Sequence, residues 1–390
     1  MKKIAFILII SLLCTIGLTS FAKNSEYDTE QTSISDELDL NVGSAYLMEA
    51  STGTVLYSEN QFTAAAPASV TKIMTLLLVC EALEAGKFKL TDTFSVSAYA
   101  ASMGGSQVFL EEGERMSVED LIKCTVIASA NDAAVALAEL TAGSEAAFVK
   151  KMNERARELG LKNTSFENTT GLDDSTTKHY SCAADIATMS RELIAYDIIL
   201  KYSSLWQDTI RDGEFTLTNT NRLVRYYEGC NGLKTGSTDK AGYCVSTTAK
   251  RDNMQLIAVI MGAESRDARN EAARKLLDFG FANYALYEES EKFIENVPVL
   301  SGVSDYVPVS SRAFFAVVDK AKLSSVEKVY ELPEELTAPV KEGDTVGRII
   351  YKLDGDQFGS TDIIATEAVE KIGLGELFLR ILSRIVCVSE

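Results

Sequence analysis

One segment of this chain can only be stable at the centre of a folded domain. Residues 69–85 form a strongly helical run between Pro67, a helix-starting residue, and Gly86, a helix-ending residue. Apolar side chains cover most of the circumference of this helix: Ile73, Met74, Leu76, Leu77, Leu78 and Val79. A helix that is apolar on nearly all sides must be surrounded by other elements. We therefore expect a helical block around residues 69–85.

Strand patterns lie on both sides of this helical block in the sequence. Residues 45–48 and 55–57 flank Ser-Thr-Gly turn residues and predict a β-hairpin. Further strands are predicted at residues 232–236, 243–248 and 256–261, and another helix at residues 269–281. Strands at both ends with helices between them indicate an α/β sandwich of the α+β type, an antiparallel sheet covered by helices. We assign this domain to residues 41–286.

After about residue 287 the pattern changes to short strands separated by turn signals such as Asp354-Gly355. The predicted strands cover residues 314–318, 326–332, 346–352 and 363–369. This pattern predicts a separate, small all-β domain over residues 287–369.

The last segment, residues 370–390, has the pattern of an amphipathic helix. Large apolar residues recur at helical spacing: Leu374, Leu377, Phe378, Ile381, Leu382, Ile385 and Val388. Charged residues occupy the other face: Glu376, Arg380 and Arg384. Either this helix packs on the protein's own surface or it lies in a membrane interface. We favour membrane association, because large apolar residues at a chain end need a partner.

The N-terminus has the pattern of an export signal. Lys2 and Lys3 precede an apolar run over residues 4–14, and small residues at Ser20 and Ala22 suit cleavage after Ala22. We expect a signal peptide at residues 1–22, an exported protein and a flexible lead-in over residues 23–40. A retained membrane anchor is the alternative.

Charge and cysteine content exclude several classes of protein. The net charge of −18 argues against a binder of the nucleic-acid backbone, which needs a basic surface. Beyond the expected signal peptide six cysteines remain, without a CxxC pair or a His/Cys cluster: Cys80, Cys124, Cys182, Cys230, Cys244 and Cys387. We expect neither a disulfide framework nor a metal site.

The central helix carries the first of three short polar motifs. Ser69 and Lys72 are three residues apart, so a helix places them on one face. Burial disfavours the ammonium form of lysine, and a neutral lysine can accept the proton of a serine hydroxyl. Such a pair needs no imidazole, and His179 is the only histidine of the chain. Alone the pattern is weak evidence, because many helices carry Ser and Lys at this spacing.

Two further motifs follow in the sequence. Ser129-Ala130-Asn131 interrupts a helical stretch that begins at the capping box of residues 117–120. Taken alone, this motif is better explained as a simple helix cap. Lys234-Thr235-Gly236 lies in a predicted strand, where lysine and threonine suit a carboxylate and glycine lets a substrate backbone approach closely.

In this order and in these settings, the three motifs resemble the D-alanyl-D-alanine carboxypeptidases of the low-molecular-mass penicillin-binding protein family. The resemblance implies a serine peptidase with a transpeptidase-like fold, which acts on the peptidoglycan stem peptide, is acylated by β-lactams and needs no cofactor. Ser69 would be the acylated nucleophile, Lys72 its base and Ser129 a proton relay. The substrate would be bound by Asn131, Lys234, Thr235, Ser237 and Arg269.

Several departures leave alternatives open. Ser237 stands where related enzymes often have histidine, and for Arg269 a solvated helix charge is the alternative explanation. We interpret His179 as part of a loop, and Glu167-Asn168 does not fit the spacing of a β-lactamase deacylation motif. The alternative functions are a serine β-lactamase and an inactive cell-wall-binding protein of the same fold.

Overall fold

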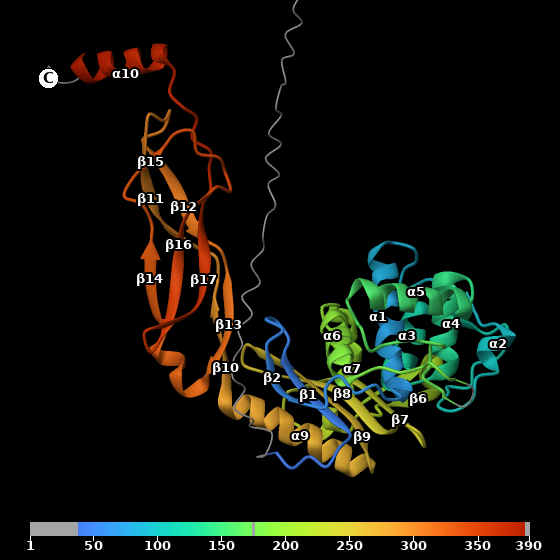
Figure 1. Cartoon of the computed structure of the whole chain (residues 1–390). Helices are drawn as coiled ribbons and strands as arrows, with labels where there is room; N and C mark the ends of the chain where they lie inside the picture. Colours follow the sequence, from blue (N-terminus) through green and yellow to red (C-terminus); the bar gives the residue numbers. More distant parts are fainter. Residues whose placement is uncertain (1–37, 174–175, 387–390) are drawn as a thin grey trace, which may run out of the picture. The chain divides into compact units, whose positions relative to one another are not determined.

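The computed structural model describes residues 38–173 and 176–386, all within one compact unit. The expected signal peptide, residues 23–37 of the expected lead-in, and Cys387 with the last residues of the chain lie outside the described residues. Figure 1 shows the arrangement of the helices and strands.

The part before β10 (Tyr284–Glu289) is organised around a five-stranded antiparallel sheet with the strand order β2-β1-β9-β8-β7. Its strands are β1 (Ser44–Glu49), β2 (Val55–Glu59), β7 (Cys230–Thr238), β8 (Gly242–Arg251) and β9 (Met254–Ala263). The predicted hairpin and the three predicted strands are all found within this sheet. The last strand, β7, is an edge strand and carries the third motif.

The alternation of side chains along β9 separates two hydrophobic cores. Leu256, Ala258 and Ile260 pack in the core formed with α9 (Arg266–Asn283). The residues between them, Ile257 and Val259, pack against the helices on the other face. This follows from the two-residue period of a strand, which sends neighbouring side chains to opposite faces. Figure 1 shows α9 on one side of the sheet and α1 and α6 on the other.

The helical block surrounds α1 (Lys72–Glu84), which contacts α3, α4, α5 and α6. Residues 72–80 of this helix are all buried, as the apolar pattern predicts. The expected start at Ser69 was wrong in detail, because residues Ala68–Thr71 form a 3-10 turn, η2, and the α-helix begins at Lys72. The remaining helices are α2 (Ala98–Ala101), α3 (Val118–Ile127), α4 (Asn131–Ala142), α5 (Glu145–Glu158), α6 (Ala183–Leu193), α7 (Asp197–Ser203) and α8 (Leu223–Tyr226).

The second motif lies at the junction of α3 and α4. Ser117 caps α3 by accepting a hydrogen bond from the backbone N–H of Asp120, as the predicted capping box requires. Ser129 follows the end of α3 with a positive φ of 63°, which a non-glycine residue rarely adopts. The chain therefore turns sharply before α4 begins.

Two small hairpins and a 3-10 turn lie nearby: β3 (Thr93–Ser95) with β4 (Arg115–Ser117), β5 (Gln207–Ile210) with β6 (Phe215–Thr218), and η3 (Arg211–Gly213).

The part after α9 consists of strands around a hydrophobic core of its own. A six-stranded sheet has the order β14-β16-β17-β12-β11-β15, and β10 pairs with β13. The elements are β10 (Tyr284–Glu289), β11 (Lys292–Leu300), β12 (Tyr306–Ser311), β13 (Phe314–Asp319), η4 (Lys320–Ser325), β14 (Glu327–Glu331), β15 (Leu336–Thr337), β16 (Thr345–Leu353) and β17 (Asp356–Ala365). The predicted strand at residues 363–369 was misplaced, because the turn at Asp354-Gly355 leads directly into β17.

The terminal helix α10 (Leu374–Val386) exposes its large apolar side chains. Leu374, Phe378 and Ile385 are each more than 60% exposed. Arg380 ties the helix to the preceding β part by donating hydrogen bonds to the carbonyls of Gly302 and Val303. Between residues 38 and 386 as described, no helix combines the length and apolar character that a membrane span requires.

Candidate active site

The first motif forms a serine–lysine pair in the interior of the protein. Lys72 is completely buried, and its Nζ lies 3.0 Å from the Oγ of Ser69. The same Nζ donates hydrogen bonds to Asn131 Oδ1 at 2.6 Å and to the carbonyl of Thr170 at 2.8 Å. Asn131 is held in this orientation because its Nδ2 donates to the carbonyl of Gly104. Lys72 therefore has three polar neighbours at fixed positions.

The environment favours the neutral form of Lys72. Burial lowers the pKa of Lys72 well below its ordinary value, the positive charge of Lys234 lowers it further, and Asp132 opposes the shift. A neutral amine has two N–H donors and one lone pair. The oxygens of Asn131 and Thr170 can only accept, so they take both N–H groups. The lone pair is left for the hydroxyl hydrogen of Ser69, which is the arrangement that a general base requires.

The second and third motifs meet through their polar side chains. Lys234, on β7, is buried and donates hydrogen bonds to Ser129 Oγ at 2.7 Å and to the carbonyl of Thr235 at 2.8 Å. Burial, together with the positive charge of Arg269, lowers the pKa of Lys234 to about 7. Because Lys234 donates to its oxygen, Ser129 keeps its own hydroxyl hydrogen for another acceptor. The helix-cap explanation of the second motif is therefore incomplete.

Strand β7 runs directly beside the serine. A Cβ on Gly236 would lie 2.7 Å from the backbone nitrogen of Ser69, so only glycine fits there. We predicted that this glycine lets a substrate backbone approach closely. In the structure, the atoms that approach Gly236 closely belong instead to η2. Thr235 donates a hydrogen bond to Thr220, and Ser237 is exposed at the cleft. The backbone N–H of Ser69 and the end of β7 thus lie side by side.

Arg269 is buried beside the cleft and is not a solvated helix charge. It is only 3% exposed, and burial is the main reason that its pKa falls to about 10. Its guanidinium donates to Asn270 Oδ1 and to the carbonyl of Cys244, both of them neutral groups. The structure therefore places a buried cation at the cleft without a carboxylate among these partners.

Sequence reasoning did not identify the loop of residues 168–171, which contacts both Lys72 and the 3-10 turn η2. Thr170 supplies the carbonyl that accepts from Lys72, and a Cβ on Gly171 would lie 1.8 Å from the carbonyl oxygen of Ala68. Asn168 closes this turn by accepting a hydrogen bond from the N–H of Gly171 at 2.7 Å. The Asn-Thr-Thr-Gly sequence was a turn signal that could have identified this loop.

His179 is buried and forms a hydrogen bond with η2, the turn that carries Ser69. Its Nδ1 accepts a hydrogen bond from the N–H of Glu167, so the proton is on Nε2, which donates to Thr71 Oγ1 in η2. Burial lowers the pKa of His179 to about 4, which keeps the ring neutral. Glu167 accepts from the N–H groups of Thr177 and Lys178, so its carboxylate is engaged outside the Ser69–Lys72 pair.

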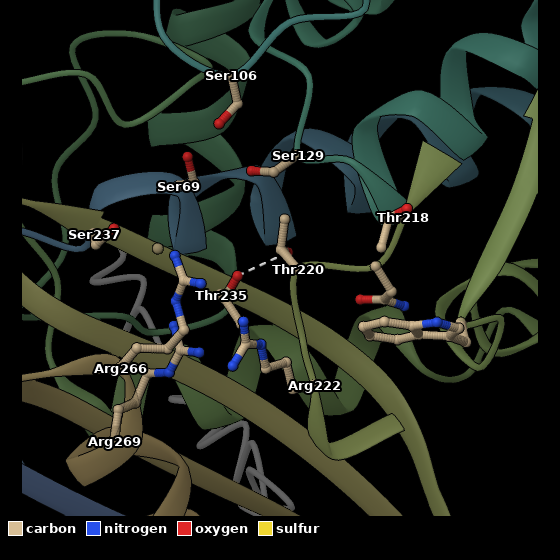
Figure 2. Close-up of a pocket in the computed structure, with 13 residues that line it drawn as sticks. Ser69, Ser106, Ser129, Thr218, Thr220, Arg222, Thr235, Ser237, Arg266 and Arg269 are labelled. Carbon is tan, nitrogen blue, oxygen red and sulfur yellow. Dashed lines mark hydrogen bonds between the residues drawn. The ribbon is translucent and has the colours of Figure 1, made fainter. Parts of the chain in front are cut away.

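The motifs open into a cleft of about 420 Å³ (Figure 2). Ser69, Ser129, Thr235, Ser237 and Arg269 all line it, as predicted. Lys72, Asn131 and Lys234 lie behind this lining, connected to it by the hydrogen bonds above. Gly236 of the third motif also lines the cleft, and sequence reasoning did not identify the other lining residues: Ser106, Trp206, Thr218, Asn219, Thr220, Arg222 and Arg266. Across residues 38–173 and 176–386 no cluster of metal-binding side chains is found.

The sequence pattern of the peptidase S11 family, described as D-alanyl-D-alanine carboxypeptidase, matches residues 30–265. This chain belongs to the peptidase S11 family. The pattern of the C-terminal domain of penicillin-binding protein 5 matches residues 281–371 of this S11 peptidase. Among curated proteins, the S11 chain is 42% identical to the D-alanyl-D-alanine carboxypeptidase DacF of Bacillus subtilis, with 96% of each chain covered. It is 31% identical to the carboxypeptidase DacA of Escherichia coli, covering 99% of this chain and 96% of the relative.

Solved structures agree with this assignment. Penicillin-binding protein 5 from Haemophilus influenzae is 33% identical with a TM-score of 0.74, and the match covers 85% of this chain and 98% of that protein. Penicillin-binding protein D2 from Listeria monocytogenes, solved with ampicillin bound, is 30% identical with a TM-score of 0.58. That match covers 63% of this chain and 99% of the Listeria protein. The predicted fold class and family are confirmed.

Proposed function

We propose that this S11 peptidase removes the C-terminal D-alanine from peptidoglycan stem peptides through an acyl-enzyme on Ser69. The observation that carries the proposal is the buried Lys72, whose lone pair is directed to the Ser69 hydroxyl by two acceptor-only neighbours. Family membership supports serine-type D-alanyl-D-alanine carboxypeptidase activity, and none of the comparisons favours a β-lactamase or an inactive binding protein.

In the acylation step, Ser69 Oγ attacks the carbonyl carbon of the penultimate D-alanine while its proton passes to Lys72 Nζ. The oxyanion that forms is stabilised by the backbone N–H groups of Ser69 and Ser237. The contact between Gly236 and the Ser69 nitrogen supports this placement, because it brings the two N–H groups to the same end of the cleft. The C–N bond then breaks and leaves an ester on Ser69.

The leaving amine takes its proton from Ser129, whose oxygen is held by Lys234, and the proton that Lys72 received from Ser69 then passes to Ser129. Lys234, Thr235 and Arg269 provide the positive charge and the hydroxyl group that bind the carboxylate of the leaving D-alanine. Water then attacks the ester and gives a proton to the neutral Lys72, which passes that proton to Ser69 Oγ as the ester bond breaks and the acid product leaves. A β-lactam acylates Ser69 through the same first step, but its amine stays tethered to the acyl group.

The test is a pair of serine variants. Ser69→Ala should lose both covalent labelling by penicillin and release of D-alanine, whereas Ser204→Ala, an exposed serine outside the cleft, should keep both. Labelling of Ser69→Ala would refute the assignment. Steady hydrolysis of nitrocefin in place of a slow burst would favour the β-lactamase alternative.

We also propose the domain division and an extracellular location. The divisions are the signal peptide of residues 1–22, the lead-in of residues 23–40, the catalytic domain of residues 41–286 and the β domain of residues 287–369. Strand β10 (Tyr284–Glu289) spans the last boundary. Peptidoglycan lies outside the cytoplasmic membrane, so its processing requires export, which the N-terminal pattern supports.

Residues 370–390 are proposed to hold the enzyme at the membrane surface. The exposed apolar side chains of α10 support this proposal, because exposed Leu, Ile and Phe gain free energy when they enter the interface of a bilayer. Deleting residues 372–390 should move the exported protein from the vesicle pellet to the supernatant. Phe378→Asp should weaken binding in the same direction, whereas Ser383→Asp on the same helix should have a smaller effect. Unchanged sedimentation of the deletion variant would refute the proposal.

A further inference from the structure

Three guanidinium groups line one side of the cleft, although one carboxylate is all that a leaving D-alanine brings. Arg266 and Arg269 lie one turn apart at the start of α9, and Arg222 immediately precedes α8 (Figure 2). The charges of Arg266 and Arg222 both lower the pKa of Arg269, which places the three cations within electrostatic reach of one another. The cleft therefore holds more positive charge than the proposed reaction uses.

No carboxylate neutralises this group within the described part of the chain. No Asp or Glu lines the cleft, and no hydrogen bond or ion pair joins Arg222 or Arg266 to one. The chain has 56 acidic residues and a net charge of −18, so its surface is not short of possible partners. Neighbouring cations repel one another, and here no carboxylate of the protein offsets the repulsion. Such a cleft favours a ligand that carries negative charges of its own.

The cleft also continues beyond Arg222. An adjoining hollow of about 530 Å³ shares Arg222 with the cleft and is lined in part by Leu223 and by Tyr226, which is 71% exposed. Asp267 and Glu271 lie in this second hollow, where Glu271 is paired with Arg274, so its far side is of mixed charge. A leaving residue with only a methyl side chain would not use this space. Once Arg269 is assigned to the main-chain carboxylate, Arg222 and Arg266 are the remaining cations that line the cleft.

We propose that Arg222 and Arg266 form a second anion subsite, which binds a carboxylate on the side chain of the residue that leaves. This inference rests on the proposed function, because it assumes that Arg269 and Lys234 hold the main-chain carboxylate. Among C-terminal residues with side chains of equal size, the enzyme then prefers to release a D-amino acid whose side chain is acidic. The chemistry is unchanged: the amide bond breaks, Ser69 keeps the acyl group and the amine leaves with the proton from Ser129.

Three peptides that differ only in the last residue test the proposal. N-acyl-L-Lys-D-Ala-D-Xaa, with D-alanine, D-glutamine or D-glutamate at the end, is hydrolysed by the purified protein and kcat/KM is measured. D-Glutamine matches D-glutamate in shape and lacks the charge. We expect the wild-type enzyme to prefer D-glutamate over D-glutamine by about tenfold, the size of one charge-assisted hydrogen bond.

Variants of Arg222 and Arg266 test whether these two residues cause the preference for D-glutamate. In the double variant Arg222→Gln, Arg266→Gln the ratio for D-glutamate over D-glutamine should fall to about one. Lys275→Gln removes one positive charge from the same helix outside the cleft and should leave the ratio unchanged. A wild-type ratio of one, or a ratio that the double variant keeps, would overturn the subsite. Absence of D-alanine release together with absence of penicillin labelling would instead overturn the proposed function.

Discussion

Gly236 provides the most quantitative test of how the site is assembled. Substitution by alanine would place a Cβ 2.7 Å from the Ser69 nitrogen, 2.9 Å from the Val70 nitrogen and 3.0 Å from Ala68 Cβ. The two nitrogens are backbone atoms, so no side-chain rotation relieves the contact. An ordinary contact begins at 3.4 Å, and η2 must therefore move about 0.7 Å away from β7.

This displacement moves the nucleophile away from the second oxyanion donor, the backbone N–H of Ser237, and away from its contact with Lys72. A shift of about 1 Å in a reacting group costs on the order of 100-fold in rate, about 2.7 kcal/mol of transition-state stabilisation. Overpacking in a buried position costs about 1–3 kcal/mol of folding free energy. We expect Gly236→Ala to remain folded at room temperature but to be acylated by penicillin about 100-fold more slowly.

The assay is the second-order acylation rate with a fluorescent penicillin, with the thermal unfolding midpoint measured on the same sample. Gly375→Ala is the control, because a Cβ at Gly375, in α10, has no atom within 4 Å. The control should be acylated at the wild-type rate. If Gly236→Ala is folded and acylated within threefold of the wild type, the close packing of η2 on β7 is not what positions Ser69.

Three further predictions concern charged groups behind the cleft. Lys234, with a pKa of about 7, loses its charge as the pH rises through that value, so KM for peptides with a free carboxylate should increase above pH 7. A KM that is flat from pH 6 to 9 would contradict this role. Asp132 is buried and accepts hydrogen bonds from the N–H groups of Val108 and Leu110, so Asp132→Ala should lower the unfolding free energy by about 2–5 kcal/mol in denaturant titrations. A loss under 1 kcal/mol would show that water replaces the carboxylate. His179 has a folded pKa of about 4, below its ordinary 6.5, so the folded state binds fewer protons and stability should fall as the pH drops from 6.5 to 4. The loss from this group is roughly 3 kcal/mol at most, and it should be absent from the pH profile of stability of His179→Gln; an identical pH dependence in the variant would refute it.

Elements with regular patterns could be predicted from the sequence. The strand β9 is a continuous apolar run that is buried on both faces, and the largely apolar α1 could only be buried, which placed Lys72 in a buried environment. Strands β11 and β12 were missed because each contains a proline that faces the partner strand, and proline weakens a strand prediction.

The parts of the site that depend on tertiary contacts could not be predicted. The role of Gly236 depends on the approach of η2, which is 165 residues earlier in the sequence at Thr71. Arg222 and Arg266 are exposed, and exposed charges carry no periodic signal. Arg269 is buried where Arg222 and Arg266 are exposed, and this difference arises only when α9 packs on the sheet.

The central claim is that Ser69 is the nucleophile and receives the acyl group. Mass spectrometry of the intact protein after incubation with penicillin, followed by peptide mapping, tests it directly. We predict one added penicillin per chain, located on Ser69. An adduct on Ser129 or on any other residue, or an unmodified protein that still releases D-alanine, would contradict the account.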